Sequence, residues 1–139
     1  SVSNVYAIGD CANHYNAFAQ KRLRLESVQN AVDQAKTAVN HVLGKAQPYH
    51  AVPWFWTNQY HLKLQMAGIS AGFDRYVLRG DMVADKFSVY YFRENQLIAV
   101  DSLNRPADHL NARKLLAAQV SPTDAQISDL NVNLNQLLG

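Results

Sequence analysis

The middle of the chain alternates short hydrophobic runs with glycine or polar turns, a pattern that predicts strands rather than helices. The runs are rich in aromatic and β-branched residues, which favour extended backbone. The predicted strands start with Trp54-Phe55-Trp56 and continue with residues 61–67, 76–79, 87–93 and 97–103. The last two are joined by Glu94-Asn95-Gln96, a short polar turn typical of a β-hairpin.

A stretch near residue 30 changes to the spacing of an amphipathic helix. Ser27 is a suitable N-cap, and Gly44 follows the expected end of this helix at Leu43. The positions that share one helical face are apolar: Val28, Ala31, Val32, Ala35, Ala38, Val39, Val42 and Leu43. This helix is the most regular element that the sequence predicts.

Further helices are predicted after the strands. Pro106 introduces one over residues 107–119, with Leu110, Leu115 and Leu116 as candidate core contacts. Ser121-Pro122-Thr123-Asp124 starts another short helix, and residues 130–138 form a tail.

The N-terminal part predicts one further strand. Residues 4–8 form an apolar run that ends at Gly9-Asp10, residues 11–25 show no regular pattern, and residues 45–53 contain two prolines and read as a linker. We therefore divide the chain into residues 1–47 and residues 48–139. The expected fold class is α+β, with an antiparallel sheet and flanking helices in the second part.

Composition limits what the chain can be. Its 139 residues are enough for one domain plus a piece of another. A formal charge of +2 without a basic run argues against nucleic acid, and neither a membrane-spanning segment nor a signal peptide is visible. Cys11 is the only cysteine, which excludes an internal disulfide and multi-cysteine metal sites and is consistent with a cytoplasmic setting. The five histidines lack ligand spacing, so no metal site is expected.

Four blocks, in order, resemble a known family. They are Val5-Tyr6-Ala7-Ile8-Gly9-Asp10-Cys11-Ala12, Arg24-Leu25-Glu26-Ser27-Val28-Gln29-Asn30-Ala31, Pro53-Trp54-Phe55-Trp56-Thr57-Asn58-Gln59-Tyr60 and Asp101-Ser102-Leu103-Asn104-Arg105-Pro106. Together they resemble the C-terminal portion of FAD-dependent, NADH-linked ferredoxin reductases of the putidaredoxin reductase and Rieske dioxygenase reductase type. The resemblance implies that residues 1–47 are the last strand and helix of a Rossmann-like FAD-binding domain, and that residues 48–139 are the reductase C-terminal domain.

The resemblance also implies a flavin site. Asp10, after Gly9, would accept a hydrogen bond from the ribityl chain of FAD. Val28, behind the Ser27 cap, would offer its backbone N–H to the pyrimidine edge of the isoalloxazine, where a helix N-terminus stabilises negative charge. Trp56 is assigned to the flavin site and to the exit of electrons, as the catalytic residue. Trp54 is assigned to the core or to the wall of the site.

By this resemblance the whole protein is an oxidoreductase that passes electrons from NADH through FAD to a [2Fe–2S] ferredoxin. Neither Gly-rich nucleotide motif of such an enzyme occurs here, so the chain alone is expected to be inactive. Its helix and strand would lack partners, and we expect it to form a homo-oligomer. The alternative is a cofactor-free α+β module that docks a redox partner or dimerises.

Two smaller features have competing interpretations. Cys11 is expected to be a small thiol packed under a loop rather than a redox group. Lys21, Arg22 and Arg24 form a basic cluster that is either ordinary solvated surface or an attraction site for an acidic ferredoxin.

Overall fold

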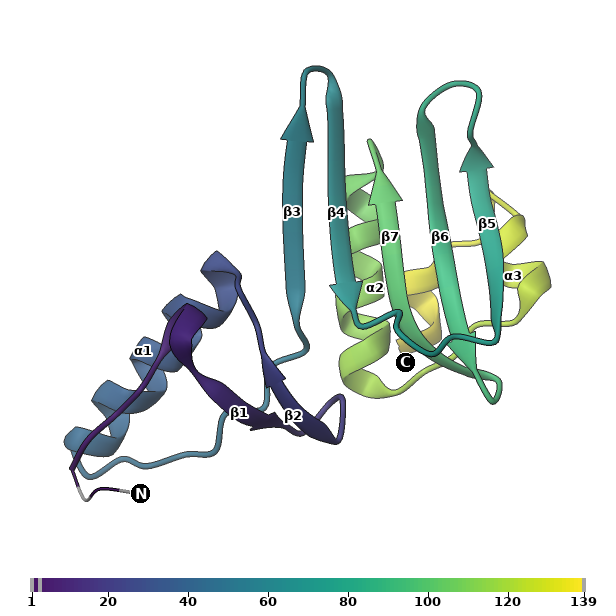
Figure 1. The fold of residues 1–139 in the computed structure, drawn as a ribbon. Helices are drawn as coiled ribbons and strands as arrows, with labels where there is room; N and C mark the ends of the chain where they lie inside the picture. Colours follow the sequence, from purple (N-terminus) through teal and green to yellow (C-terminus); the bar gives the residue numbers. More distant parts are fainter. Residues whose placement is uncertain (1, 3, 139) are drawn as a thin grey trace. The chain divides into compact units, whose positions relative to one another are not determined.

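A computed structural model describes residues 2 and 4–138, and the chain divides into two compact units (Figure 1). The first ends at Pro53 and the second begins at Trp54. Residues 45–53, the stretch that reads as a linker, contain no helix or strand. The expected boundary, after residue 47, lies inside that stretch.

The main element of the first unit is the helix α1, Val28–Val42. Its N-cap is Ser27, whose Oγ accepts a hydrogen bond from the Asn30 N–H at 3.1 Å. After the helix, Gly44 adopts a left-handed φ of 72°, a conformation that costs glycine little. The sequence therefore predicted both ends of this helix correctly.

The residues before α1 differ from the prediction. Residues 4–8 are not a strand: Val5, Tyr6 and Ile8 are exposed, and no strand of the described chain pairs with them. A lone apolar run becomes a strand only where a neighbour supplies hydrogen bonds. The short 3-10 helix η1, Gly9–Cys11, follows, and Cys11 is exposed rather than packed under a loop.

Residues 11–25 are more regular than the sequence indicated. β1, Asn13–Asn16, pairs antiparallel with β2, Lys21–Arg24, in a small two-stranded sheet. The Asn16 side chain accepts a hydrogen bond from the Ala19 N–H at 2.9 Å, which stabilises the turn between the strands. Strands of four residues with mixed polarity give too little periodicity for sequence reasoning to find.

Helix α1 buries polar side chains and exposes its apolar face. Gln29, Asn30 and Gln34 are buried within the first unit. The exposed side chains on the opposite side are apolar: Val28, Val32, Val39 and Val42. The face that the sequence marks as hydrophobic is thus not covered by the described part of the first unit.

The second unit is built on a five-stranded antiparallel sheet in the order β3-β4-β7-β6-β5. The strands are β3 Trp54–Gln59, β4 Leu62–Gly68, β5 Arg75–Asp81, β6 Lys86–Arg93 and β7 Gln96–Leu103. All five were predicted. β6 and β7 form the expected hairpin, with Glu94 and Asn95 at positive φ as a tight two-residue turn requires.

Helices cover one face of this sheet. α2, Pro106–Ala118, packs on β4 and β7, α3, Asp124–Ser128, packs on β5, and the 3-10 helix η2, Leu134–Leu138, packs on α2. Leu115 and Leu116 are fully buried beneath the sheet, as expected. Leu110, the third predicted core contact, is exposed, because its position on α2 turns away from the strands.

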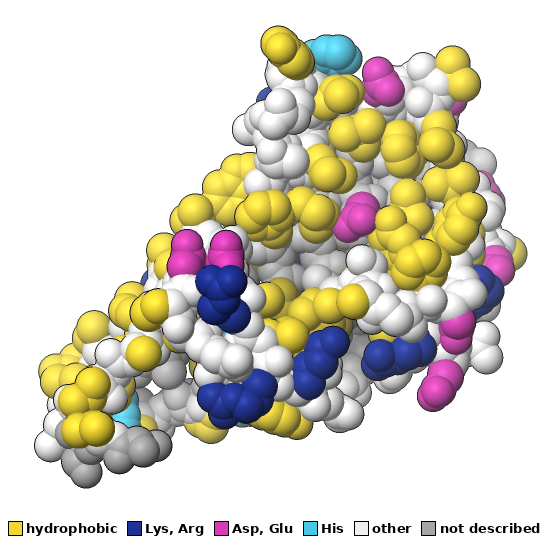
Figure 2. Space-filling view, viewed as in Figure 1, with side chains coloured by type: hydrophobic (Ala, Val, Ile, Leu, Met, Phe, Trp, Pro, Cys, Tyr) yellow, Lys and Arg dark blue, Asp and Glu magenta, His cyan; other side chains and the backbone are white. Residues whose placement is uncertain are grey.

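The other face of the sheet is largely apolar, and none of the described helices of the second unit packs on it. One row of paired residues crosses all five strands of this face: Phe55, Met66, Asp101, Val89 and Leu78. Figure 2 shows hydrophobic side chains spread across this side of the sheet. Burial raises the pKa of the Asp101 carboxyl, and burial followed by the charge of Asp101 raises the pKa of Tyr91 to about 12.

Candidate functional site

The Gly9-Asp10 turn lies against the start of α1. Gly9 adopts φ +72°, and a Cβ at this position would lie 3.5 Å from the Ala31 Cβ. Its N–H donates to Gln34 Oε1 at 2.7 Å, so a buried glutamine of the helix fixes the turn. Glycine is required here by the left-handed backbone rather than by a steric clash.

The Asp10 side chain is free to take a ligand. Asp10 is exposed, and no described side chain or N–H bonds to its carboxylate. Its backbone carbonyl accepts a hydrogen bond from Arg24 Nη1 at 3.3 Å, and Arg24 also forms an ion pair with Glu26 at 2.6 Å. The turn is therefore held through its backbone, while the carboxylate stays available as an acceptor.

The N-terminus of α1 provides an unpaired donor. The Ser27 side chain satisfies the N–H of Asn30, and the Ser27 carbonyl accepts from Ala31. Val28 is the first residue of the helix, so its N–H has no acceptor within the helix, and none is found in the rest of the described chain. Gly9 and Asp10 belong to η1, which packs on α1 through Ala31 and Gln34, while Ser27 caps α1 and Val28 begins it.

A largely apolar cavity of about 630 Å³ lies in the first unit beside the Gly9 turn, since Ile8 and Gln34 are among its lining residues. His14, His41 and Tyr49 also line it, and none of the five predicted cofactor residues does. We therefore do not include it in the site.

Trp56 lies on β3, the edge strand of the sheet in the second unit, and is 37% exposed. Its indole stacks on that of Trp54, with ring centroids 5.3 Å apart and an angle of 28° between the planes. The two side chains share one face of the strand, as their spacing predicts. That face is the one on which α2 packs, because Trp54 also contacts two residues of the helix.

These two contacts come from His109 and Arg113. The His109 ring centroid lies 5.7 Å from that of Trp54, and the Arg113 guanidinium carbon lies 4.5 Å from the Trp54 ring centroid. His109 is buried, and neither ring nitrogen has a hydrogen-bond partner among the described residues. Burial, followed by the charge of Arg113, lowers the pKa of His109 to about 4, so the imidazole is neutral at neutral pH.

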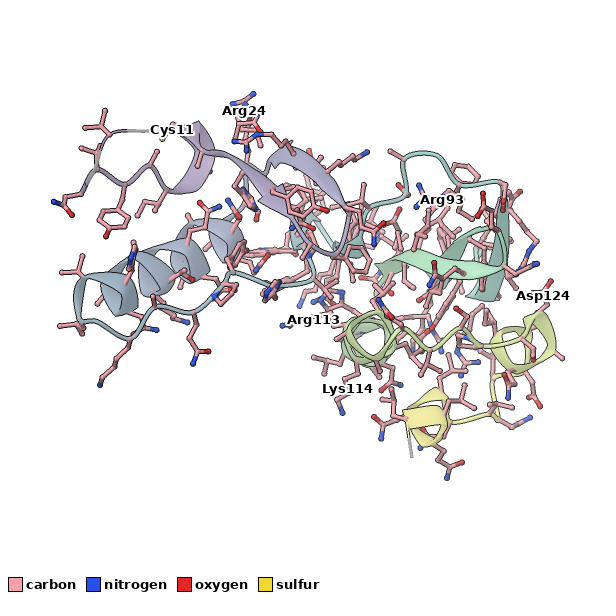
Figure 3. The ribbon with its side chains drawn as sticks, turned by 90° about the horizontal axis from the view of Figure 1, so that it is seen from below. Cys11, Arg24, Arg93, Arg113, Lys114 and Asp124 are labelled. Atoms are coloured by element: carbon pink, nitrogen blue, oxygen red, sulfur yellow. The ribbon has the colours of Figure 1, made fainter. Side chains whose placement is uncertain are left out.

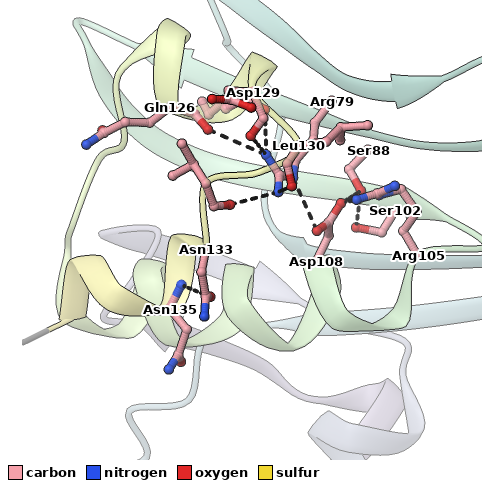
Figure 4. Close-up of polar contacts among 12 residues, drawn as sticks. Arg79, Ser88, Ser102, Arg105, Asp108, Gln126, Asp129, Leu130, Asn133 and Asn135 are labelled. Atoms are coloured by element: carbon pink, nitrogen blue, oxygen red, sulfur yellow. Dashed lines mark hydrogen bonds and ion pairs between the residues drawn. The ribbon is translucent and has the colours of Figure 1, made fainter.

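A second row of paired residues crosses the face of the sheet that α2 covers, and it runs from Trp56 to a buried polar network. Trp56, Gln65, Ser102, Ser88 and Arg79 are successive partners across the sheet. Ser88 Oγ lies 3.0 Å from both Ser102 Oγ and Asp108 Oδ2 (Figure 4). Asp108, in the first turn of α2, also pairs with Arg79 and with Arg105.

Arg79 uses its remaining donors on the chain after α3. Its guanidinium donates to the carbonyl oxygens of Ile127 at 2.8 Å, Asp129 at 2.7 Å and Val132 at 3.0 Å (Figure 4). This arrangement fixes the C-terminal segment to β5. The role of Arg79 is structural, since Arg79 and Asp108 are both buried.

The sequence prediction did not include the supporting residues. Gln34, Arg79 and Asp108 are polar groups whose partners lie far away in sequence, so periodicity gives no signal for them. His109 and Arg113 are four residues apart on one predicted helix, and that spacing could have placed them side by side.

The family model described as "Reductase C-terminal" matches residues 54–138, which is the second unit up to the last described residue. The chain belongs to this reductase C-terminal family. Individual relatives of the reductase C-terminal family also match the first unit, and three of them follow.

The ferredoxin reductase subunit of 5,5'-dehydrodivanillate O-demethylase from Sphingobium sp. is 46% identical over 138 residues, which is 99% of this chain and 34% of that protein. The ferredoxin reductase for the CYP199A2 system from Rhodopseudomonas palustris is 41% identical with a TM-score of 0.90, over 95% of this chain and 33% of that one. The reductase in the covalent putidaredoxin reductase–putidaredoxin complex is 33% identical with a TM-score of 0.88, over 94% and 31%. The chain therefore spans about a third of the length of these relatives.

Among the residues that the structure describes, no group of three or more His, Cys, Asp or Glu side chains could hold a metal ion. None of the described helices is long and apolar enough to cross a membrane.

Proposed function

We propose that this chain is the C-terminal portion of a flavoprotein that takes electrons from NADH through FAD and delivers them to a [2Fe–2S] ferredoxin of an oxygenase system. The observation that carries the proposal is the Gly9-Asp10 turn packed on α1, the helix that Ser27 caps. It occurs in a chain that is 46% identical to a ferredoxin reductase subunit. Residues 1–47 then represent the end of the FAD-binding domain and residues 48–139 the reductase C-terminal domain.

The residues at the η1–α1 junction fit a flavin. An exposed carboxylate without a partner suits a ribityl hydroxyl, from which it would accept a hydrogen bond. The unpaired Val28 N–H suits the carbonyl oxygen at the pyrimidine edge of the ring. Asp10 and Val28 would therefore hold FAD, with Gly9 and Ser27 fixing the backbone that presents them.

FAD, when bound, supplies a hydride acceptor that can release its electrons one at a time. The N-terminus of α1 acts on the charge of that group: its positive end favours a negative flavin edge over a neutral one. Because Ser27 already satisfies Asn30, the Val28 N–H is the donor best placed to provide this stabilisation.

Trp56 would form the exit side of the flavin site. It is partly exposed on an edge strand and its ring is held by Trp54, so it can contact a flavin or a partner without rearrangement of the sheet. The exposed Lys21, Arg22 and Arg24 of β2 would attract an acidic ferredoxin and raise the rate of association. NADH would bind through sequence outside these 139 residues, which contain no G-x-G-x-x-G motif.

The competing candidate is a cofactor-free module that binds the redox partner or dimerises, and the uncovered apolar faces of α1 and of the sheet favour it. The full-length protein that contains this chain distinguishes the two. Our proposal expects copurified FAD and NADH-driven reduction of the ferredoxin. A colourless full-length protein that still binds the ferredoxin would overturn it in favour of the module.

A further inference from the structure

Three other side chains contact the Trp54 indole. Trp56 stacks on it from the same strand, while His109 and Arg113 contact it from α2. β3 is an edge strand, bonded to β4 alone, so a side chain near its end receives little support from neighbouring strands. The Trp54 ring provides Trp56 with the aromatic contact that a neighbouring strand does not.

This geometry allows α2 to restrict the motion of the Trp54 ring and, through that ring, the motion of Trp56 on the edge strand. Trp54 sits opposite Ala67, which is buried and too small to fix an indole by itself. The guanidinium of Arg113, 4.5 Å from the ring centroid, adds a cation–π contact. His109 packs at 5.7 Å as a neutral ring. Stacked aromatic pairs prefer such offset arrangements, so fixing one ring restricts the other.

We propose that Arg113 is a positioning residue for Trp56 and acts through the ring of Trp54. The inference rests on the proposed function only in giving Trp56 a place in electron delivery, because the stack itself is a property of the second unit. Arg113 contacts neither the flavin nor the partner in this account. Its removal should loosen Trp56 and slow electron delivery while leaving the fold intact.

The Trp54–Trp56 stack can be followed directly by spectroscopy, because these two residues are the only tryptophans of the chain. Two indoles this close couple in the far-ultraviolet circular dichroism spectrum and give a paired positive and negative band. Trp56→Phe and Trp54→Phe should each abolish that band, which establishes its origin. The decisive variant is Arg113→Met, which keeps the length of the side chain and removes the planar cation.

We expect Arg113→Met to reduce the coupled band roughly twofold or more and to raise quenching of tryptophan fluorescence by acrylamide. Arg113→Lys should restore part of the band. The matched control is Lys114→Met: Lys114 follows Arg113 on α2, points elsewhere and contacts Asn135 Oδ1 at 3.0 Å (Figure 3). An unchanged band in folded Arg113→Met, or an equal loss in Lys114→Met, would overturn the proposal.

If Arg113→Met does not fold, the same comparison between Arg113→Lys and the wild type decides the question, since lysine cannot stack as a plane. In the full-length reductase, Arg113→Met should lower ferredoxin reduction roughly twofold or more and leave dye reduction unchanged. If instead Trp56→Phe has no effect on ferredoxin reduction, the proposed function of Trp56 fails. The spectral result on the stack would still stand.

Discussion

Arg79 and Asp108 form an ion pair within the second unit, with 3.4 Å between Nε and Oδ1 and only 6% of each side chain exposed. The pair links the edge strand β5 to the first turn of α2, and the same guanidinium binds carbonyl oxygens of the segment after α3. Three separate parts of the unit thus depend on one side chain.

Replacing that side chain should destabilise the second unit strongly. Arg79→Met leaves Asp108 buried with Arg105 as its remaining cation and removes the guanidinium donor from three carbonyl oxygens, of which only that of Asp129 also accepts from a backbone N–H. Removing one partner of a buried pair costs about 3–5 kcal/mol. Urea unfolding of the chain measures this. Arg75→Met is the control: Arg75 pairs with the more exposed Asp124 at 2.5 Å, and we expect a loss of about 1 kcal/mol or less.

The buried His109 predicts how stability depends on pH. Its pKa is about 4 in the folded chain against 6.5 in the unfolded chain, so between these values the unfolded state binds more protons. The free energy of unfolding should therefore fall as the pH drops from 6.5 towards 4. His109→Phe should flatten this slope, and the exposed-site control His61→Gln should not.

The difference between the wild-type and His109→Phe curves isolates this effect from other groups, including Asp101, whose pKa burial raises. Denaturant midpoints measured across that pH range would suffice. Parallel curves for the two proteins would show that His109 does not titrate as its burial requires.

The exposed apolar face of α1 predicts self-association of this chain. Val28, Val32, Val39 and Val42 are exposed along one side of a regular helix, and exposed apolar stripes of this kind usually mark an interface. Static light scattering should show a mass above that of the monomer, and Val32→Lys with Val39→Lys should lower it. The matched control is Asn40→Lys, which adds a lysine at an exposed position of α1 outside the stripe. A strict monomer with an ordered α1 would contradict the prediction.

Elements that depend on local residue patterns could be predicted from the sequence, whereas elements that depend on distant neighbours could not. The five strands of the sheet and the caps of α1 rest on local patterns, and both were predicted correctly. Residues 4–8 were predicted as a strand because their composition is right, yet a strand also needs a paired neighbour, which the described chain does not provide. The β1–β2 hairpin was not predicted because its strands are short and polar.

The residues of the candidate site also differ in whether the sequence alone could reveal them. Gly9, Asp10, Ser27 and Val28 could be named from motifs, and they lie on two elements that pack together, η1 and α1 with its cap. Gln34 and Arg113, which hold the turn and the tryptophan stack, could not, because their contacts depend on how distant segments pack.

Asp10 provides a test of the flavin site. In the full-length reductase, Asp10→Ala removes the acceptor proposed for a ribityl hydroxyl, and we expect roughly tenfold weaker retention of FAD, the cost of one hydrogen bond to a charged group. The flavin content after gel filtration, read from the absorbance ratio of flavin to protein, measures this. Asp33→Ala, on the same unit but bonded to Gln29, should retain normal flavin. Unchanged flavin in Asp10→Ala would remove Asp10 from the site.

The central claim, that this chain carries the route by which electrons leave a flavin for a ferredoxin, is tested most directly by Trp56→Phe in the full-length reductase. The measurement is the rate of NADH-driven ferredoxin reduction divided by the rate of reduction of a small dye. We predict that this ratio falls, since a dye can reach the flavin without Trp56, while Phe55→Leu on the opposite face of β3 leaves the ratio unchanged. An equal effect of Trp56→Phe on both rates would contradict the account.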